Sequence, residues 1–154
     1  MIAAAPSAPV PTPRLDLSGR CIVLALSGGI ACYKAAELCR LLVKAGAQVR
    51  VLMSAGALRF ITAETMQALS GHPVATDIWD AAEPNGMPHI NLTRDLTRPA
   101  EAAWVADAIV IAPASADAIA RLAQGRADDL LSLTCLARPW GSAAAGAGSG
   151  MGRV

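Results

Sequence analysis

Residues 21–34 (CIVLALSGGIACYK) restrict the possible folds of this chain more than any other stretch. Cys21–Leu26 is a short apolar run without a charge, which is typical of a strand buried on both faces of a parallel sheet. The turn SGG follows, and adjacent glycines permit both a tight turn and the close approach of a second backbone or a ligand. Residues 30–45 then predict a helix with one charged, solvent-facing stripe. Gly46 predicts its end.

A strand, a glycine turn and a helix in succession form a place where an anion can bind. The N-terminus of a helix presents unpaired N–H groups and a partial positive charge, worth about 0.3–2 kcal/mol to a nearby anion. Ser27 adds a hydroxyl group to this turn. The glycines alone fit a tight turn that binds nothing equally well, so both interpretations stand at this point.

Residues 48–53 (QVRVLM) predict a second strand, which makes residues 21–53 a right-handed βαβ unit. The unit lacks the GxGxxG turn of nicotinamide-binding domains, and no acidic residue between Glu37 and Glu64 is placed to hold a ribose. The chain also lacks the GxxxxGK[ST] loop of ATP-binding proteins. Ser54, at the end of the second strand, suits a phosphate or the edge of a flavin instead.

Residues 108–112 (AIVIA) predict a further buried strand, followed by a polar turn at Ser115 and a helix to about residue 124. In an open α/β sheet, ligands bind beyond the carboxyl ends of the strands, where the strand order reverses. Ser27, Ser54 and Ser115 all follow strands and would lie at that edge. The pattern therefore favours a ligand that carries an anionic group.

The remaining segments predict shorter elements. In chain order these are a helical piece at 55–60, a helix from the N-cap Thr62 to about Leu69, an extended segment at 73–78, a loop at 80–88, a surface excursion at 93–100, a helix at 101–106 and a helix at 127–137 whose first turn holds Asp128 and Asp129.

Composition excludes several classes of function. A net charge of +1 over 154 residues gives no support for binding nucleic acid or a charged membrane, and no apolar run approaches the roughly 18 residues of a membrane span. The four cysteines form no CxxC pair, which indicates reduced thiols in the cytoplasm and no metal site. We expect a disordered Ala/Pro-rich segment at 1–18, one domain at 19–137, and an irregular Gly/Ala-rich segment at 138–154.

Five blocks between residues 19 and 137 resemble, in the same order, the flavin-dependent cysteine decarboxylases. The blocks are SGGIACYKAAELCRLL, SAGALRFITAETMQALSG, GMPHINL, APASADAIARLAQG and ADDLLSLTCLA. The resemblance implies an α/β fold, a Rossmann-like open parallel sheet with helices on both faces. It is strongest to the branch that decarboxylates 4'-phosphopantothenoylcysteine to 4'-phosphopantetheine in coenzyme A biosynthesis. The resemblance implies that FMN oxidises the thiol side of such a substrate, that carbon dioxide leaves, and that the reduced flavin returns the electrons.

The resemblance also implies site residues. His89 matches the catalytic base near the substrate thiol, although outside the GMPHINL block it would be interpreted as an ordinary loop histidine. The implied FMN contacts are Ser27, Gly28, Gly29, Ile30, Ser54, Phe60, Ser115, Ala116 and Asp117. The family further implies a trimer-based homo-oligomer in which a neighbouring subunit completes the flavin site, with a small-molecule substrate.

Two family segments have no counterpart here: a PAMNxxMW motif whose asparagine contacts the substrate carboxylate, and a flap that carries a catalytic cysteine. The last strands of the sheet are missing from the pattern too. We therefore expect an open edge at residues 108–112, weak FMN binding and no measurable decarboxylation by this chain. An inactive FMN-binding fragment or a regulatory subunit is the alternative function. A flavin prenyltransferase, whose first turn resembles GASG, and a nicotinamide-binding domain fit less well.

Overall fold

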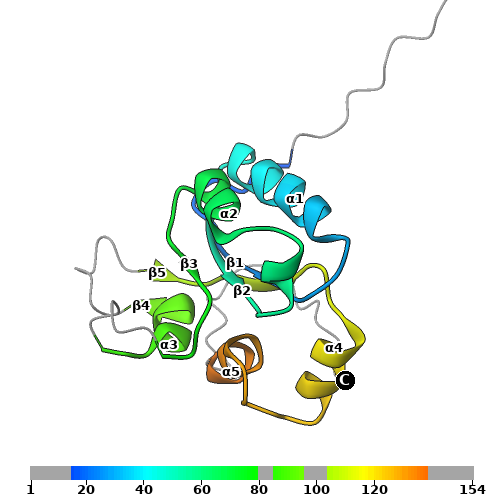
Figure 1. Ribbon diagram of the computed structural model, residues 1–154. Coiled ribbons are helices and arrows are strands. Elements are labelled where there is room, and N and C mark those ends of the chain that lie inside the picture. The colour runs from blue at the N-terminus through cyan, green and yellow to red at the C-terminus, as the bar shows by residue number, and fades with distance from the viewer. Residues whose placement is uncertain (1–14, 80–84, 96–103, 139–154) are drawn as a thin grey trace, which may run out of the picture.

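The main sheet of the chain is parallel in the computed structural model, which describes residues 15–79, 85–95 and 104–138 (Figure 1). Four strands pair in the order β3-β2-β1-β6. They are β1 (Cys21–Leu26), β2 (Gln48–Met53), β3 (Val74–Ala75) and β6 (Ala108–Ile111). The predicted bounds of β1 and β2 are confirmed, and that of β6 to within a residue.

Strand β1 lies between β2 and β6, in parallel register with both. Ile22 pairs with Val49 on one side and with Ala108 on the other. The chain moves from β1 to β2 in one direction and later returns to add β6 on the opposite side of β1. The carboxyl ends of β1 and β6 therefore flank the point where the strand order reverses, which is where open α/β sheets bind ligands.

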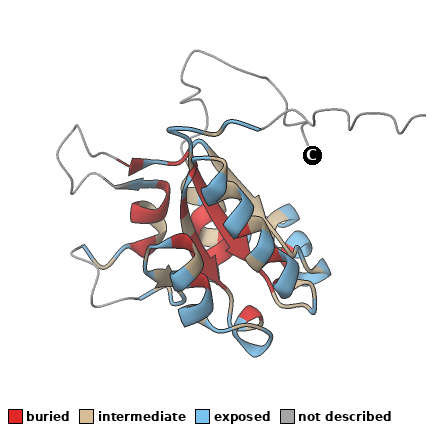
Figure 2. Ribbon diagram, turned by 90° about the horizontal axis from the view of Figure 1, so that it is seen from above, coloured by how far each residue is buried: buried red, intermediate tan, exposed pale blue. Residues whose placement is uncertain are grey.

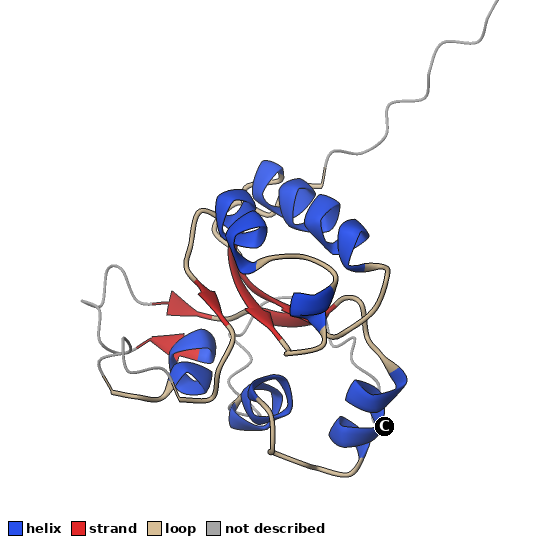
Figure 3. Ribbon diagram, in the orientation of Figure 1, coloured by secondary structure: helices blue, strands red, loops and turns tan. Residues whose placement is uncertain are grey.

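Alternate side chains of β1 enter two separate cores. Leu24 and Leu26 pack beneath α1 (Cys32–Lys44) and α2 (Ala63–Ser70), whereas Val23 and Ala25 pack on the opposite face of the sheet. That second core includes side chains from α5 (Leu130–Ala137). Figures 1 and 3 show helices on both faces of the sheet, and Figure 2 shows the buried strands between them. The predicted Rossmann-like arrangement is confirmed.

The helix ends follow the sequence signals closely. Thr62 caps α2 by accepting a hydrogen bond from the Thr65 N–H, and Gly71 ends the helix in the left-handed conformation. Helix α4 (Ala116–Ala123) begins after Ser115, and a single 3₁₀ turn, η1 (Ala57–Arg59), follows β2.

Three predictions along the chain were wrong. The segment 101–106 contains a strand, β5 (Trp104–Val105), which pairs with β4 (Arg94–Asp95). The predicted loop 80–88 ends one residue early, because Pro88 is the first residue of helix α3 (Pro88–Thr93) and proline suits that position. Helix α5 begins at Leu130 rather than Ala127, because Asp129 accepts a hydrogen bond from Ser132 as its N-cap.

The solvent face of α1 is broader than the charged stripe that its sequence suggested. Tyr33, Leu41 and Val43 are exposed beside the charged residues, because α1 buries only a narrow line of small side chains against the sheet. The excursion predicted at 93–100 lies mostly outside the described residues, and Thr93 itself is buried.

Strand β6 forms an edge of the sheet among the described residues, since it pairs with β1 only. The division of the chain at residues 18 and 137 stays a prediction. Residues 1–14 and 139–154 lie outside the part of the chain that the structure describes.

Candidate functional site

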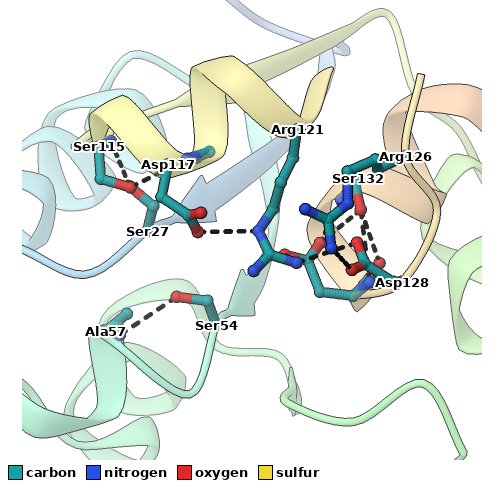
Figure 4. A network of polar contacts seen from close by, with 11 residues as sticks. Ser27, Ser54, Ala57, Ser115, Asp117, Arg121, Arg126, Asp128 and Ser132 are labelled. Atoms are coloured by element: carbon teal, nitrogen blue, oxygen red, sulfur yellow. Dashed lines mark hydrogen bonds and ion pairs between the residues drawn. The ribbon is translucent and has the colours of Figure 1, made fainter. Parts of the chain in front are cut away.

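The hydroxyl of Ser27 links the carboxyl ends of β1 and β6, where the strand order reverses. Its Oγ donates to the Pro113 carbonyl at 2.6 Å and accepts from the Ser115 N–H at 2.7 Å (Figure 4). The Ser27 N–H also donates to the Pro113 carbonyl, at 3.1 Å. With 3% of its surface exposed, Ser27 is buried and its hydroxyl is occupied. Ser27 therefore serves the protein's own framework before any ligand.

The two glycines of the first turn have different surroundings. A Cβ atom added to Gly28 would lie 2.9 Å from the carbonyl carbon of Gly56, so the turns after β1 and β2 touch backbone to backbone. A Cβ added to Gly29 would meet nothing closer than the Pro113 ring, at 3.8 Å. Gly28 is therefore required by the fold, whereas Gly29 leaves open space above the turn.

The hydroxyls of Ser54 and Ser115 both bond to nearby backbone. Ser54 accepts a hydrogen bond from the Ala57 N–H at 3.2 Å, and Ser115 accepts one from the Ala118 N–H at 3.2 Å as the N-cap of α4. The three serines predicted from the sequence do gather at one sheet edge (Figure 4). Each, however, shapes a turn there with its side chain.

The N-terminus of α1 is left open. Its N-cap, Ala31, makes no side-chain capping bond, and the first turn holds no acidic residue. Within the described residues, the N–H groups of Gly28, Gly29, Ile30 and Ala31 donate to no protein acceptor. These four N–H groups lie in the turn before the positive end of a thirteen-residue helix, an arrangement that suits an anion.

The first turn of α4 carries a network of ion pairs. Asp117 accepts a hydrogen bond from Arg121 Nε at 2.8 Å, and Arg121 Nη1 lies 2.9 Å from Asp128 (Figure 4). Arg126 also pairs with Asp128. These hydrogen bonds raise the pKa of Arg121, Asp117 contributing most. The Asp117 carboxylate is thus paired with Arg121 of the same helix, and the neighbouring Ala116 is exposed.

Two apolar side chains of the predicted site face solvent. Ile30 is 78% exposed next to the open N-terminus of α1, and Phe60 is 53% exposed just after η1. Both side chains therefore present apolar surface that a flat apolar ligand can cover.

His89 does not lie with the serines. It belongs to α3, which Figure 1 shows on the opposite side of the molecule from α4, with α5 between them. The structure thus places this histidine in a short helix and not in a loop. Its Nδ1 atom is buried without a hydrogen-bond partner, and burial lowers the pKa of the imidazole below its ordinary value.

The sequence did not single out Gly56, Pro113 or Arg121. Gly56 lies three residues past a predicted strand and Gly28 lies two residues past another, and this similarity was a usable signal. Arg121 stands four residues after Asp117, the spacing of a helical ion pair. Pro113 carried no signal of its contact with Ser27, which depends on how the strands pair.

The described residues contain neither a metal-binding cluster nor a membrane-spanning helix. No group of three or more histidine, cysteine or acidic side chains is arranged there to hold a metal ion. No helix in those ranges has both the length and the apolar character needed to cross a membrane.

Comparisons with known proteins agree with the fold. The flavoprotein family model matches residues 11–144. The coenzyme A biosynthesis bifunctional protein CoaBC of Haemophilus influenzae is 50% identical over 123 residues, which cover 80% of this chain and 28% of that protein.

Two solved structures are also similar. The FMN-dependent cysteine decarboxylase SpaF has a TM-score of 0.67 and 26% identity over 80% of this chain and 65% of that one. A PPC decarboxylase mutant complexed with pantothenoylaminoethenethiol has a TM-score of 0.55 and 28% identity over 79% of this chain and 61% of that one. With 134 of its 154 residues matched (11–144), the chain belongs to the flavoprotein family.

Proposed function

We propose that this chain binds FMN where the turn after β1 meets the turns after β2 and β6. The observation that carries the proposal is the turn that leads into α1, whose N–H groups at positions 28–31 have no protein acceptor among the described residues and suit the FMN phosphate. The solved relative SpaF is an FMN-dependent enzyme, which supports the same choice of ligand.

The residues present fit FMN in two further respects. The space above Gly29 is open, so the backbone donors can be approached closely. The exposed side chains of Ile30 and Phe60 offer apolar surface for the flavin ring. Ser27, Ser54 and Ser115 fix the three turns, while Ala116 and Asp117 border the site on α4.

We further propose that the chain is the decarboxylase portion of a protein that converts 4'-phosphopantothenoylcysteine to 4'-phosphopantetheine. The chain spans 28% of the length of its Haemophilus relative, a coenzyme A biosynthesis protein. When bound, FMN supplies a two-electron acceptor that also returns the electrons after carbon dioxide leaves. His89 is the base: its lowered pKa keeps it neutral near pH 7, and because Nδ1 is enclosed, the proton moves through Nε2.

The position of α3 supports a homo-oligomer, based on trimers, in which His89 of one subunit faces the FMN site of another. Figure 1 shows α3 and α4 on opposite sides of one chain, so a single subunit does not bring the two together. Light scattering tests this, and a monomer mass for a folded, flavin-loaded sample would refute it. We propose a cytoplasmic location, in keeping with reduced cysteines.

Replacement of Gly29 tests the FMN site. Gly29→Val places an isopropyl group in the open space above the turn and should abolish quenching of FMN fluorescence on titration, while the fold is kept. Ala123→Val, at an exposed position near the end of α4, is the matched control and should bind as the wild type does. Equal quenching by wild type and Gly29→Val would exclude this site.

Replacement of His89 tests the reaction. In a longer chain that carries the family's C-terminal segment, His89→Asn should keep FMN and lose carbon dioxide release from 4'-phosphopantothenoylcysteine. Full turnover by that variant would remove His89 from the mechanism. The 154-residue chain should bind FMN without measurable turnover; if the longer chain also stays inactive with FMN bound, the alternative of a flavin-binding or regulatory protein holds instead.

A further inference from the structure

Helix α3 is too short to be stable by itself. It has six residues, and isolated helices shorter than about 12 residues are marginal in water. The carbonyl groups of a helix's last turn have no partner inside the helix, and in a helix this short they are a large share of the total. Its position must therefore be fixed by contacts from elsewhere in the protein.

Two side chains from different strands bond to consecutive carbonyl groups near the C-terminal end of α3. Arg50 on β2 donates from Nη1 to the Asn91 carbonyl at 2.7 Å, and Trp104 on β5 donates from Nε1 to the Leu92 carbonyl at 2.7 Å. The Ala106 N–H then donates to the Thr93 carbonyl at 2.9 Å. A cation at the C-terminal end of a helix also has a favourable interaction with the helix dipole.

Arg50 and Trp104 form one unit. The guanidinium carbon of Arg50 lies 4.4 Å from the centre of the Trp104 ring, within the range of a cation–π contact. Trp104 is 3% exposed and Arg50 is half-buried, so the contact is partly shielded from water and salt. Because the guanidinium is planar, stacking on the ring also fixes the direction in which its N–H groups point.

The side chain of Asn91 holds the turn that precedes α3, at Asn85, against this helix. Its side-chain amide exchanges two hydrogen bonds with that of Asn85, each 3.0 Å long, and Asn85 Oδ1 also accepts from the Met87 N–H at 3.0 Å. Arg50 thus bonds to the backbone of the residue whose side chain holds the entrance to α3. The start and the end of the helix are tied to one strand of the central sheet.

We propose that Arg50, together with Trp104, is a positioning residue that sets the place and orientation of α3 and thereby of His89. The assignment rests on the proposed function, in which His89 is the base. Arg50 does not touch the reacting atoms in this scheme. It acts through the backbone of α3, by linking the helix to β2.

The test uses the 154-residue chain and the two imidazoles that it contains, His72 and His89, followed by NMR titration. The pKa of His89 is lowered by burial, so an anchored α3 keeps it below its ordinary value of 6.5. Arg50→Gln should release α3, admit water to Nδ1 and raise the pKa of His89 toward 6.5, while that of His72 stays unchanged. His89→Asn assigns the two signals.

Matched variants separate position from charge. Trp104→Phe keeps Arg50 and its charge but removes the donor to the Leu92 carbonyl, and should raise the pKa of His89 in the same direction. It also serves if Arg50→Gln fails to fold. Arg50→Lys should give a smaller rise than Arg50→Gln, because it keeps a cation and a donor. Arg40→Gln removes an exposed arginine paired with Glu37 and should leave both histidines unchanged.

Each outcome is decisive. The positioning role is excluded if Arg50→Gln or Trp104→Phe folds and its His89 has the same pKa as in the control variant Arg40→Gln. That result would leave the base role of His89 untouched, since the titration needs neither FMN nor turnover. Conversely, a His89→Asn variant with full turnover would exclude the base role and leave the anchoring of α3 standing.

Discussion

The two strand–turn–helix junctions at the switch point look alike in sequence and differ in structure. After β6, Ser115 caps α4, and its own N–H is taken up by the Ser27 hydroxyl. After β1, α1 begins at Cys32 with no side-chain cap. Among the described helices of eight or more residues, α2, α4 and α5 have a side-chain N-cap and α1 has none. The protein therefore caps one junction with its own side chain and leaves the other uncapped, which is where the proposed FMN site lies.

Gly28→Ala should have the largest effect on the α1 junction. The new Cβ would lie 2.9 Å from the Gly56 carbonyl carbon, and because both partners are backbone, the two turns must separate. We expect a loss of up to about 3 kcal/mol in the free energy of unfolding, measured by urea denaturation. Gly29→Ala is the matched control and should change stability by less than about 1 kcal/mol. Equal stabilities would show that the turns are not in contact.

Ser27→Ala should break the link between the junctions. It removes one of two donors to the Pro113 carbonyl and the acceptor of the Ser115 N–H, so the Ser115 N–H loses its partner while the carbonyl keeps the bond from the N–H of residue 27. The expected cost is about 2 kcal/mol. Ser115→Ala, which removes only a helix cap, should cost about 1 kcal/mol in the same denaturation experiment. A reversed order would mean that Ser27 is dispensable to the framework.

Ala31→Asp would close the α1 junction with a charge from the protein. A carboxylate at the N-terminus of α1 should stabilise the chain by about 0.3–1 kcal/mol through the helix dipole. It should at the same time weaken FMN binding, because it repels the phosphate. Ala31→Asn has the same shape without the charge and should weaken FMN binding less. If both variants bind FMN as the wild type does, the phosphate does not lie at α1.

Lowering the pH should slightly weaken the ion pairs at the α4 junction and should leave the α1 junction unchanged. Burial opposes ionisation of Asp128, but its hydrogen bonds with Arg126 and Arg121 prevail and lower the pKa below 3.8. The stabilisation is therefore complete above pH 3.8 and is lost as pH falls below that value. Amide chemical shifts at positions 115–118 should move in this range more than those at 28–31. Asp128→Asn should remove the difference, whereas equal movement in that variant would point to another group.

The sequence predicted the sheet well because each strand carries its own signal. Cys21–Leu26 and Gln48–Met53 are apolar runs bounded by turn residues, and their bounds follow from composition. Trp104–Val105 was mistaken for helix because its neighbours Glu101 to Ala103 favour one. Its strand pairing and the bond from Trp104 to the Leu92 carbonyl are long-range contacts that no local pattern encodes.

The site was predicted in outline only. The sequence placed Ser27, Ser54 and Ser115 at one edge, since the carboxyl ends of parallel strands share an edge. It could not show that their hydroxyls are used internally, because the bond from Ser27 to Pro113 joins residues far apart in the chain. The sequence also could not show that Gly28 lies against the backbone of Gly56, whereas its neighbour Gly29 faces open space.

The contact between Gly28 and Gly56 also limits how this sequence can change over generations or in a mutant library. Glycine is already the smallest residue, so a side chain gained at one position cannot be offset by a loss at the other. No double substitution can therefore compensate at this pair. Both positions must stay glycine, although they belong to turns that lie far apart in the sequence. A library for altered ligand specificity should hold both glycines constant and vary position 29, where an added atom meets only space and the edge of Pro113.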